Sequence, residues 1–399
     1  MDANEASSRI VEKSEDKSIE IDGKIRIQSV AFVVDEGYLV GGDGHEIRRW
    51  RIQDGKEVGQ PMCARSDVLS IAVSRDRKWI VSGTYDGQVA VWGAENHKTI
   101  GFRGHKLGVF AVDVSPDGTR IATGSYDFTV CVWSLSTGEL LLGPFEHNGT
   151  VAAVKISPDG HFIATATWSS ESVRVYDNNG HLLVDTPIQV GSSYNQSLAW
   201  ADLGKELFAL SEDGNIHCID VATRTTLSKW AIHANNNPRC IALASDGAFI
   251  AASDSYLVSF WDVATHKQIG PLVHHPDEVR YVAISANGDL AIGGGKKVIL
   301  RKLPDILPSS YFDHVCVFSS NPSVKEILFT MDHLQQQPDI NDIRLNFPRD
   351  LTGHFTKFSG FPVASGSYGD IYKGSLNVRG GSIDVRHCLL SHGDTSNNY

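Results

Sequence analysis

Two short segments carry residue types that bind phosphate or metal ions in other proteins. Gly293-Gly294-Gly295-Lys296-Lys297 combines a glycine run with two lysines, but it lacks the spacing and the Ser or Thr of a phosphate-binding P-loop. It falls where a turn between two strands is expected, so we interpret it as a turn. His274 and His275 are potential metal ligands, yet neighbouring residues on a strand point to opposite faces. We therefore predict no metal site and no catalytic triad.

Any site in this chain must be positioned by a repeat that recurs about every 42 residues. Seven times, a short β-like run ends in an aromatic or apolar residue that is usually followed by a polar one. The runs cover residues 44–50, 87–92, 128–133, 172–177, 214–220, 256–262 and 297–301. One of the seven endings reads Trp-Asp in full, at Trp261-Asp262. A period of this length with a terminal Trp-Asp is typical of one blade of a β-propeller.

The order of strands and turns is the same in each repeat. In the third repeat, a strand over 109–114 runs into the turn Ser115-Pro116-Asp117-Gly118, a second strand covers 120–125, and a turn at 126–128 leads into the third strand. The apolar runs are short, alternate with polar residues and are rich in Val and Ile, which favours strands over helices. The repeats delimit blades at 21–64, 65–104, 105–146, 147–190, 191–232, 233–273 and 274–310. Because one blade cannot bury both of its faces, the blades must stack around an axis.

These repeats resemble those of the WD40, or β-transducin-like, proteins over about three quarters of the chain. The resemblance implies an all-β fold, a seven-bladed WD40 β-propeller at residues 18–310, followed by a mostly irregular C-terminal extension. Propellers of this family close by pairing an N-terminal strand with the last blade. Ser18-Ile19-Glu20-Ile21 is one candidate for the closing strand, and Tyr311-Phe312-Asp313-His314-Val315 is the alternative.

The same resemblance implies a buried hydrogen-bonded tetrad within a blade. The third repeat has a residue for each of its four positions: His105, Thr123, Asp127 and Trp133. The Asp accepts from one ring nitrogen of the His, the other ring nitrogen meets the Thr hydroxyl, and that hydroxyl accepts from the indole N–H. Other repeats lack members, since Ala64 stands at the His position of the second repeat. We interpret the tetrad as structural and expect the blades to differ in rigidity.

Function then depends on the surface of the propeller. In WD40 proteins, partners usually bind one circular face, made by the turns between second and third strands and by the entries to the first strands. The corresponding candidates here are Tyr85, Phe110, Tyr126, Trp168, Glu212 and Arg280. Aromatic and Arg side chains dominate interface energetics, although some of these residues could instead pack within loops. Glu212 and Asp254 would suit a basic segment on the partner.

A second resemblance concerns the segment beyond the repeats. We interpret 311–350 as a linker with a short helix at 324–334. Residues 361–374 resemble the glycine-rich loop that opens a eukaryotic protein kinase and covers the ATP phosphates. Gly366 and Gly369 stand at its second and third glycines, and Ala364 stands where the first is expected. We therefore predict that 351–399 is a truncated, poorly ordered segment similar to a kinase N-lobe.

The remaining catalytic parts of a kinase do not appear in this sequence. The lysine strand is replaced by Ser382-Ile383-Asp384-Val385-Arg386-His387-Cys388, and neither a His-Arg-Asp nor an Asp-Phe-Gly triplet occurs. We therefore predict no enzymatic activity and no cofactor, and a non-catalytic scaffold that binds other proteins or peptides. The alternative is a fragment of a WD40–kinase fusion that binds ATP and phosphorylates proteins only in a longer form.

Composition narrows the partner classes further. The chain has 36 basic and 47 acidic residues, a formal net charge of −11, which argues against nucleic acid and anionic membranes as partners. Residues 1–17 are expected to be a disordered tail, and the first twenty residues contain no secretory signal. The six cysteines show no Cys-x-x-Cys pair. We expect a cytoplasmic protein, with a nuclear location and the oligomeric state left open.

Overall fold

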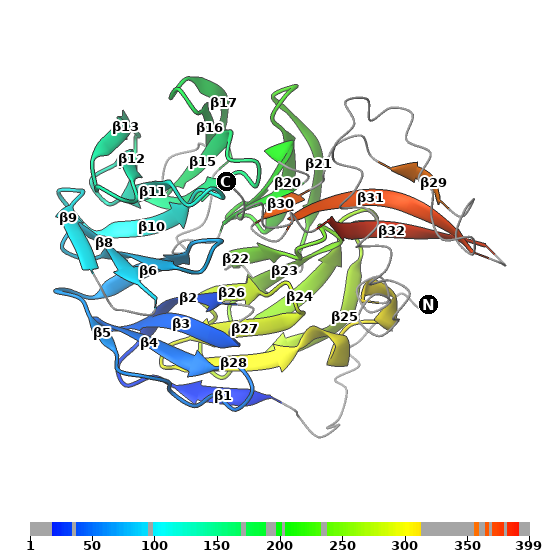
Figure 1. Cartoon of the computed structure of the whole chain (residues 1–399), viewed down its shortest axis with the longest axis horizontal. Coiled ribbons are helices and arrows are strands. Elements are labelled where there is room, and N and C mark those ends of the chain that lie inside the picture. Colours follow the sequence, from blue (N-terminus) through cyan, green and yellow to red (C-terminus); the bar gives the residue numbers. More distant parts are fainter. Residues whose placement is uncertain are drawn as a thin grey trace, which may run out of the picture.

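The computed structural model describes most of the repeat region and a few strands beyond it. The described residues are 18–33, 37–94, 99–168, 173–188, 197–201, 204–232, 238–312, 355–358, 364–366, 369–378 and 381–390. Those from 18 to 312 form a ring of seven four-stranded antiparallel sheets (Figure 1). The all-β, seven-bladed propeller predicted from the repeats is confirmed.

The strands of each blade follow one another in the chain, from the axis outwards. The first blade contains β2 (Ile27–Val33), β3 (Tyr38–Asp43), β4 (Glu46–Arg51) and β5 (Met62–Cys63); the second contains β6 (Val68–Val73), β7 (Trp79–Thr84), β8 (Gln88–Gly93) and β9 (Thr99–Arg103). The third contains β10 (Val109–Val114), β11 (Arg120–Ser125), β12 (Thr129–Ser134) and β13 (Leu140–Glu146); the fourth contains β14 (Val151–Ile156), β15 (Phe162–Thr167), β16 (Val173–Asp177) and β17 (Leu182–Thr186).

The remaining blades repeat this order until the last. The fifth contains β18 (Leu198–Ala201), β19 (Glu206–Leu210), β20 (Asn215–Asp220) and β21 (Thr225–Ala231); the sixth contains β22 (Pro238–Leu243), β23 (Phe249–Asp254), β24 (Leu257–Asp262) and β25 (Gln268–His274). The seventh contains β26 (Tyr281–Ile284), β27 (Asp289–Gly294), β28 (Lys297–Lys302) and, from the other end of the chain, β1 (Ile19–Asp22). The first strands of neighbouring blades contact one another around the whole ring, so they surround the axis.

Burial follows this radial order. The middle strand β11 is buried at five of its six positions, because it lies between two neighbouring blades. The outermost strand β13 is exposed or half-buried at every position. Separate apolar clusters fill the spaces between blades; one of them joins Val81, Val89 and Val91 of the second blade to Val109 and Val112 of the third. The core is therefore divided among interfaces between blades, and each blade depends on its neighbours for stability.

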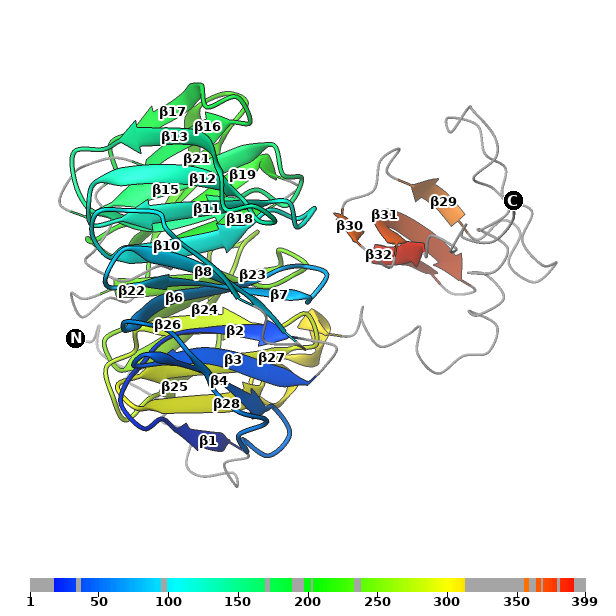
Figure 2. The ribbon, with the colours of Figure 1, turned by 60° about the vertical axis from the view of Figure 1, so that its left-hand side comes forward.

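The ring is closed by the N-terminal candidate strand. β1 pairs antiparallel with β28, from Ile19 opposite Leu300 to Asp22 opposite Lys297 (Figures 1 and 2). The alternative candidate does not take this place in its described part. Tyr311 ends the short 3-10 helix η4 (Ser309–Tyr311), which follows η3 (Leu303–Asp305), and its hydroxyl donates to Asp262 Oδ2 at 2.7 Å.

Four further strands form a separate sheet: β29 (Phe355–Phe358), β30 (Ala364–Gly366), β31 (Gly369–Val378) and β32 (Gly381–Leu390). Gly366 pairs with Gly369 at the end of the β30–β31 hairpin. The predicted tail at 1–17 and the predicted helix at 324–334 lie outside the described residues, as does all of the predicted linker except its first two residues. In the part of the chain that is described, no helix is long and apolar enough to cross a membrane.

Candidate functional site

In five of the blades, a β-bulge at the start of the innermost strand interrupts the regular alternation of side chains at one residue. The register shifts by one residue at Gln28, Leu69, Phe110, Ala152 and Arg239 in blades one, two, three, four and six. In blade seven, Arg280 has the equivalent place, because Val279 N donates to Ser255 O as Val68 N donates to Gly44 O. We call these six positions the bulge residues. The corresponding residue of blade five lies outside the described part of the chain.

The bulge residues lie at the same end of each blade as the turn between its second and third strands. In blade three, Val109 at the start of β10 pairs with Ser125 at the end of β11, so Phe110 lies beside the turn 126–128. We call this end of the propeller the bulge face. It corresponds to the circular face that the sequence predicted for partner binding.

Aromatic side chains gather on the bulge face at blades two to four. The Phe110 ring centroid lies 5.1 Å from that of Trp168 and 6.0 Å from that of Tyr126, and Tyr126 lies 6.2 Å from Phe128. Phe110 is only 7% exposed, whereas Tyr126 and Phe128 are 48% and 46% exposed. Phe110 and the half-buried Trp168 therefore underlie Tyr126 and Phe128, and do not themselves form the outermost layer.

The neighbouring turn extends this exposed surface. Tyr85, in the turn of blade two, is 67% exposed, and Leu107, which precedes β10, is 47% exposed. The aromatic patch is defined here as Tyr85, Leu107, Tyr126 and Phe128, with Phe110 and Trp168 beneath it. Exposed large apolar groups that cluster in this way mark interaction surfaces more reliably than single ones do.

Phe128 was missed by the sequence reasoning, although a signal was present. It stands at the turn position that Gly87 and Gly214 occupy in other blades, and all three have positive φ, at 68°, 87° and 78° respectively. A bulky residue in this conformation costs about 1–2 kcal/mol relative to glycine. The signal was therefore an aromatic residue at a turn position where other blades have glycine, and this position lies in the apolar part of the surface.

The tetrad residues of blade three form one hydrogen-bonded chain beneath this turn. The ring of His105 contacts Asp127 through Nδ1 at 3.1 Å and Thr123 Oγ1 through Nε2 at 2.7 Å, and Trp133 Nε1 donates to the same hydroxyl at 2.8 Å. His105 and Thr123 are buried. The chain therefore ties the turn that carries Tyr126 and Phe128 to the interior of the blade.

Asp127 fastens this turn further. Its carboxylate accepts from Lys106 N at 2.8 Å and from the Thr129 hydroxyl at 2.6 Å. Burial alone would raise the pKa of Asp127, but the hydrogen bonds from His105, Thr129 and the Lys106 amide outweigh it and hold the pKa well below its ordinary value. The aromatic patch thus rests on a turn that is anchored at several points.

Other described blades carry partial versions of the tetrad. In blade two, Trp92 Nε1 donates to Ser82 Oγ at 2.9 Å, with no His at the first position. In blade four, burial and the nearby Arg174 lower the pKa of His147 to about 4. In blade seven, His275 Nδ1 accepts from Asp277 N at 3.0 Å. The turns of these blades therefore have different anchors from those of blade three.

The predicted charged contact residues lie on other blades. Glu212 is exposed in the turn of blade five, and Arg280 lies beside Glu278, with Nη2 3.9 Å from Oε2. The expectation that Asp254 faces a partner is wrong, because this residue is only 5% exposed. At the equivalent position in blade one, Asp43 accepts backbone N–H groups of the loop before β2, from Lys24 at 2.6 Å and Ile25 at 2.8 Å. Asp43 therefore fastens the loop that leads into its own blade.

The remaining candidate sites have structural environments. Within the described residues, no group of three or more His, Cys, Asp or Glu side chains is placed to hold a metal ion. His274 stacks on Tyr256, while His275 is buried. Burial raises the pKa of three thiols to about 12, those of Cys131, Cys218 and Cys240.

The WD40 family model, described as WD domain, G-beta repeat, matches residues 56–93, 96–134 and 139–177. Each match begins in or just before the outer strand of one blade and ends with the third strand of the next. Three WD40 repeats therefore lie within the seven-bladed propeller. The offset between WD40 repeat and blade explains the closure of the ring, because the last blade must take its outer strand from the N-terminal side of the first repeat. A search among curated proteins finds no matching relative.

Proposed function

We propose that this WD40 propeller is a non-catalytic scaffold that binds a partner protein or peptide on its bulge face, through the aromatic patch. The observation that carries the proposal is the cluster of Tyr85, Leu107, Tyr126 and Phe128, each more than 45% exposed, on two adjacent blades. Propellers of the WD40 class typically bind other proteins, and their shape presents such a surface without any need for catalytic groups.

The patch has the composition of an interface centre. Tyr side chains offer large apolar area together with a hydroxyl at the tip, and they lose little conformational freedom on binding. Phe110 supports Tyr126 from below, and Trp168 packs against Phe110, both through tilted ring contacts. A patch built on an anchored turn pays less ordering cost when a partner binds, which favours affinity.

An acidic residue in the turn of another blade offers a contact for a charged residue of the partner. Glu212 on blade five is exposed and would suit a basic residue of the partner. We propose a protein or peptide partner, and neither a nucleic acid nor a membrane, because the chain has a formal net charge of −11.

The test is capture of partners by the intact chain. Tyr85→Ala combined with Tyr126→Ala removes exposed rings without opening a cavity, and should reduce recovery of specific partners at least about tenfold. Leu227→Ala is the matched control, because Leu227 is 53% exposed on the outer strand β21. Unchanged recovery with the double variant, at an unchanged melting temperature, would refute the assignment of the surface.

A second candidate function is that of a WD40–kinase fusion. It is favoured by the hairpin of β30 and β31, in which Gly366 and Gly369 pair at the turn of a segment that resembles a kinase glycine loop. Sequencing the transcript beyond the codon for Tyr399 tests it. Continuation into a lysine strand and a catalytic loop would favour the fusion, whereas transcripts that all stop there would favour the scaffold alone.

A further inference from the structure

The first residue of the second strand has an equivalent place in every blade. It is aromatic in blades one, two, four and six, as Tyr38, Trp79, Phe162 and Phe249. These side chains pack against the apolar clusters that join each of these blades to the next one. In blade three, Arg120 has this place and donates to Asn178 Oδ1 and Gly160 O of blade four. The position therefore fills the boundary between one blade and the next.

Blade seven departs most from this pattern. Blade five has Glu206 at this place and blade seven has Asp289, the shortest side chain of the seven. A pocket of about 470 Å³ lies there, lined, among others, by Ile19, Asp289 and Lys302 of blade seven and by Tyr38, Arg51 and Ile52 of blade one. We call it the seam pocket; its volume is within the range of ligand pockets, about 300–1,000 Å³. The place that a ring fills at other boundaries is thus open at this one.

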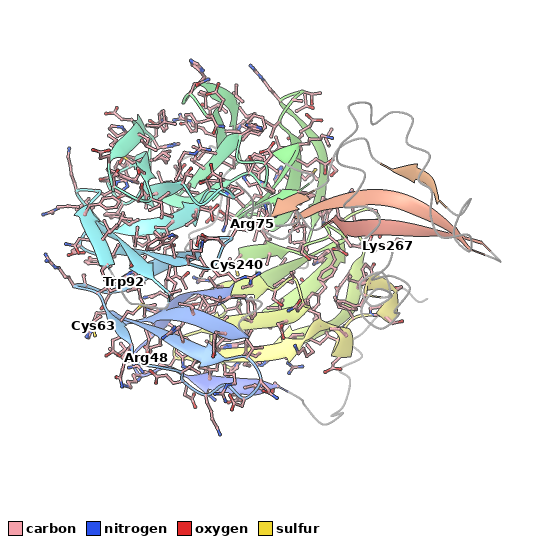
Figure 3. The ribbon with its side chains drawn as sticks, in the orientation of Figure 1. Arg48, Cys63, Arg75, Trp92, Cys240 and Lys267 are labelled. Atoms are coloured by element: carbon pink, nitrogen blue, oxygen red, sulfur yellow. The ribbon has the colours of Figure 1, made fainter. Side chains whose placement is uncertain are left out.

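The seam pocket lies at the end of the propeller opposite the bulge face. Asp289 pairs with Lys302 and Tyr38 with Arg51, at the ends of their strands that are remote from the turns between second and third strands. Figure 3 labels Arg48 on β4, the strand that ends at Arg51. A partner bound in the seam pocket would therefore leave the aromatic patch accessible.

The seam pocket combines an apolar floor with a buried acceptor. Ile52 is 8% exposed, and the half-buried Ile19 packs against the same apolar cluster between blades seven and one. The Asp289 side chain is 6% exposed and accepts from Ser285 Oγ at 3.0 Å. Because the two oxygens of a carboxylate can accept about four hydrogen bonds, Asp289 can accept from a further donor.

The charged side chains that line the seam pocket are already in ion pairs. Arg51 Nη1 lies 2.9 Å from Asp54 Oδ2, and Lys302 Nζ contacts Asp289 Oδ1. A ligand with a charge of its own would lose hydration without finding an unpaired ion among these residues. A neutral group that carries a hydrogen-bond donor therefore fits this environment best.

We propose that the seam pocket binds the ring of a Tyr or Trp side chain of a partner protein, whose O–H or N–H donates to Asp289. An aromatic side chain fills the equivalent place in four other blades, so this is the group that the boundary accommodates. Tyr and Trp need a partner for their polar group when they are buried, and they are enriched among the residues that anchor interfaces. The inference goes beyond the proposed function, because it gives the scaffold a second binding surface.

Two substitutions at Asp289 test the ring and the hydrogen bond separately. Asp289→Phe gives blade seven the residue that Phe249 provides in blade six, so the new ring should occupy the seam pocket. Asp289→Ala removes the acceptor and leaves the pocket open. Asp305→Ala is the control, because Asp305 is an exposed acid in η3, which follows β28 of the same blade. Thermal melting shows whether each variant stays folded.

The probes are N-acetyl-tyrosinamide, N-acetyl-tryptophanamide and N-acetyl-phenylalaninamide, added to the intact chain with carbon-13 at the isoleucine δ1 methyl groups. The methyl signals of Ile19 and Ile52, assigned with Ile19→Val and Ile52→Val, should shift and saturate. The Tyr and Trp amides should bind about three to ten times more tightly than the Phe amide, which corresponds to one hydrogen bond. Asp289→Ala should abolish this preference, Asp289→Phe should abolish the shifts, and the control should retain both.

A display library of random peptides tests whether a protein supplies the ring. Selection uses the chain with Tyr85→Ala and Tyr126→Ala, and peptides that also bind Asp289→Phe are removed. The remaining peptides should share a Tyr or Trp whose replacement by Ala abolishes binding. Peptides that share neither residue, or binding of the amides without any selected peptide, would overturn a protein side chain as the occupant.

The outcomes also separate this inference from the proposed function. Absence of shifts at Ile19 and Ile52, shifts that persist in Asp289→Phe, or equal binding of the three amides would overturn the inference and leave the aromatic patch untouched. Tyr85→Ala with Tyr126→Ala, which tests the proposed function, should leave binding of the amides unchanged, because these residues lie at the other end of the propeller.

Discussion

The substitution Thr123→Val tests whether the tetrad stabilises blade three. Val has nearly the shape of Thr but lacks the hydroxyl, which is completely buried and contacts both the His105 ring at 2.7 Å and the Trp133 indole at 2.8 Å. Its loss leaves one buried acceptor and one buried donor unsatisfied. Each such group costs about 1–3 kcal/mol, so we expect a loss of about 2–4 kcal/mol once the gain from the added methyl group is subtracted.

Blade four provides a matched control at the equivalent position. Thr165 is also completely buried, but its hydroxyl donates only a long bond to Arg174 O, at 3.5 Å. Thr165→Val should therefore cost less than about 1 kcal/mol. Both substitutions exchange the same atoms in the same kind of strand, so the difference between them isolates the tetrad.

Hydrogen exchange measured by mass spectrometry is the suitable assay, because a ring of blades can open locally before it unfolds as a whole. In the Thr123→Val variant, the amides of β11 and β12 should lose protection by about the free energy given above, while those of β15 and β16 keep theirs. Urea denaturation gives the global change for comparison. Equal effects of the two substitutions, or a smaller effect at Thr123, would refute the reasoning.

Three further predictions concern pH, the patch and the closure of the ring. The pKa of His147 is lowered to about 4 by burial and by Arg174. The neutral ring therefore contributes fully to stability above about pH 6.5, the ordinary pKa of His, and this contribution is lost as the pH falls towards 4. The free energy of unfolding should fall by about 3 kcal/mol over this range, and His147→Gln should abolish the effect. Phe128→Gly should leave the urea midpoint nearly unchanged, because release of the positive-φ strain offsets the lost contact with Tyr126, yet it should weaken partner capture; a large destabilisation would contradict this. Ile21→Ala should lower the free energy of unfolding, measured in urea, by about 2–4 kcal/mol, because Ile21 is only 2% exposed within the closing strand. Ile19→Ala should lower it by less, because Ile19 is half-buried. Equal losses would argue against closure of the ring by a specific register of β1.

Features that lie within one blade could be predicted well from the sequence. The spacing of His105, Thr123, Asp127 and Trp133 follows from the order of strands and turns inside a single repeat, and the hydrogen bonds among them span fewer than 30 residues. Local turn chemistry places such residues before any packing is considered. The same holds for Tyr85 and Tyr126, which lie in turns and are exposed as expected for turn residues.

Features that depend on contacts between blades could not be predicted from the sequence. Phe110 and Asp254 have surface positions in the repeat pattern, yet both are buried, and the rings of Tyr126 and Trp168 pack against Phe110. The β-bulges could not be predicted either, because an extra residue in a strand requires no particular amino acid at that position.

Repeat spacing alone is enough to establish seven blades and their turns, since those arise from contacts close in sequence and from the need to bury both faces of each sheet. The resemblance of the repeats to those of WD40 proteins adds the tetrad. The meeting of Arg239 with Glu278, which lie 39 residues apart on neighbouring blades, required the curvature of the closed ring. Residues 18–21 were one of two candidates for the closing strand, but the choice between the two and the register of β1 against β28 also required the closed ring. Such contacts are set by the angle and offset between blades, which are global properties of the packed ring and leave no periodic trace in the chain.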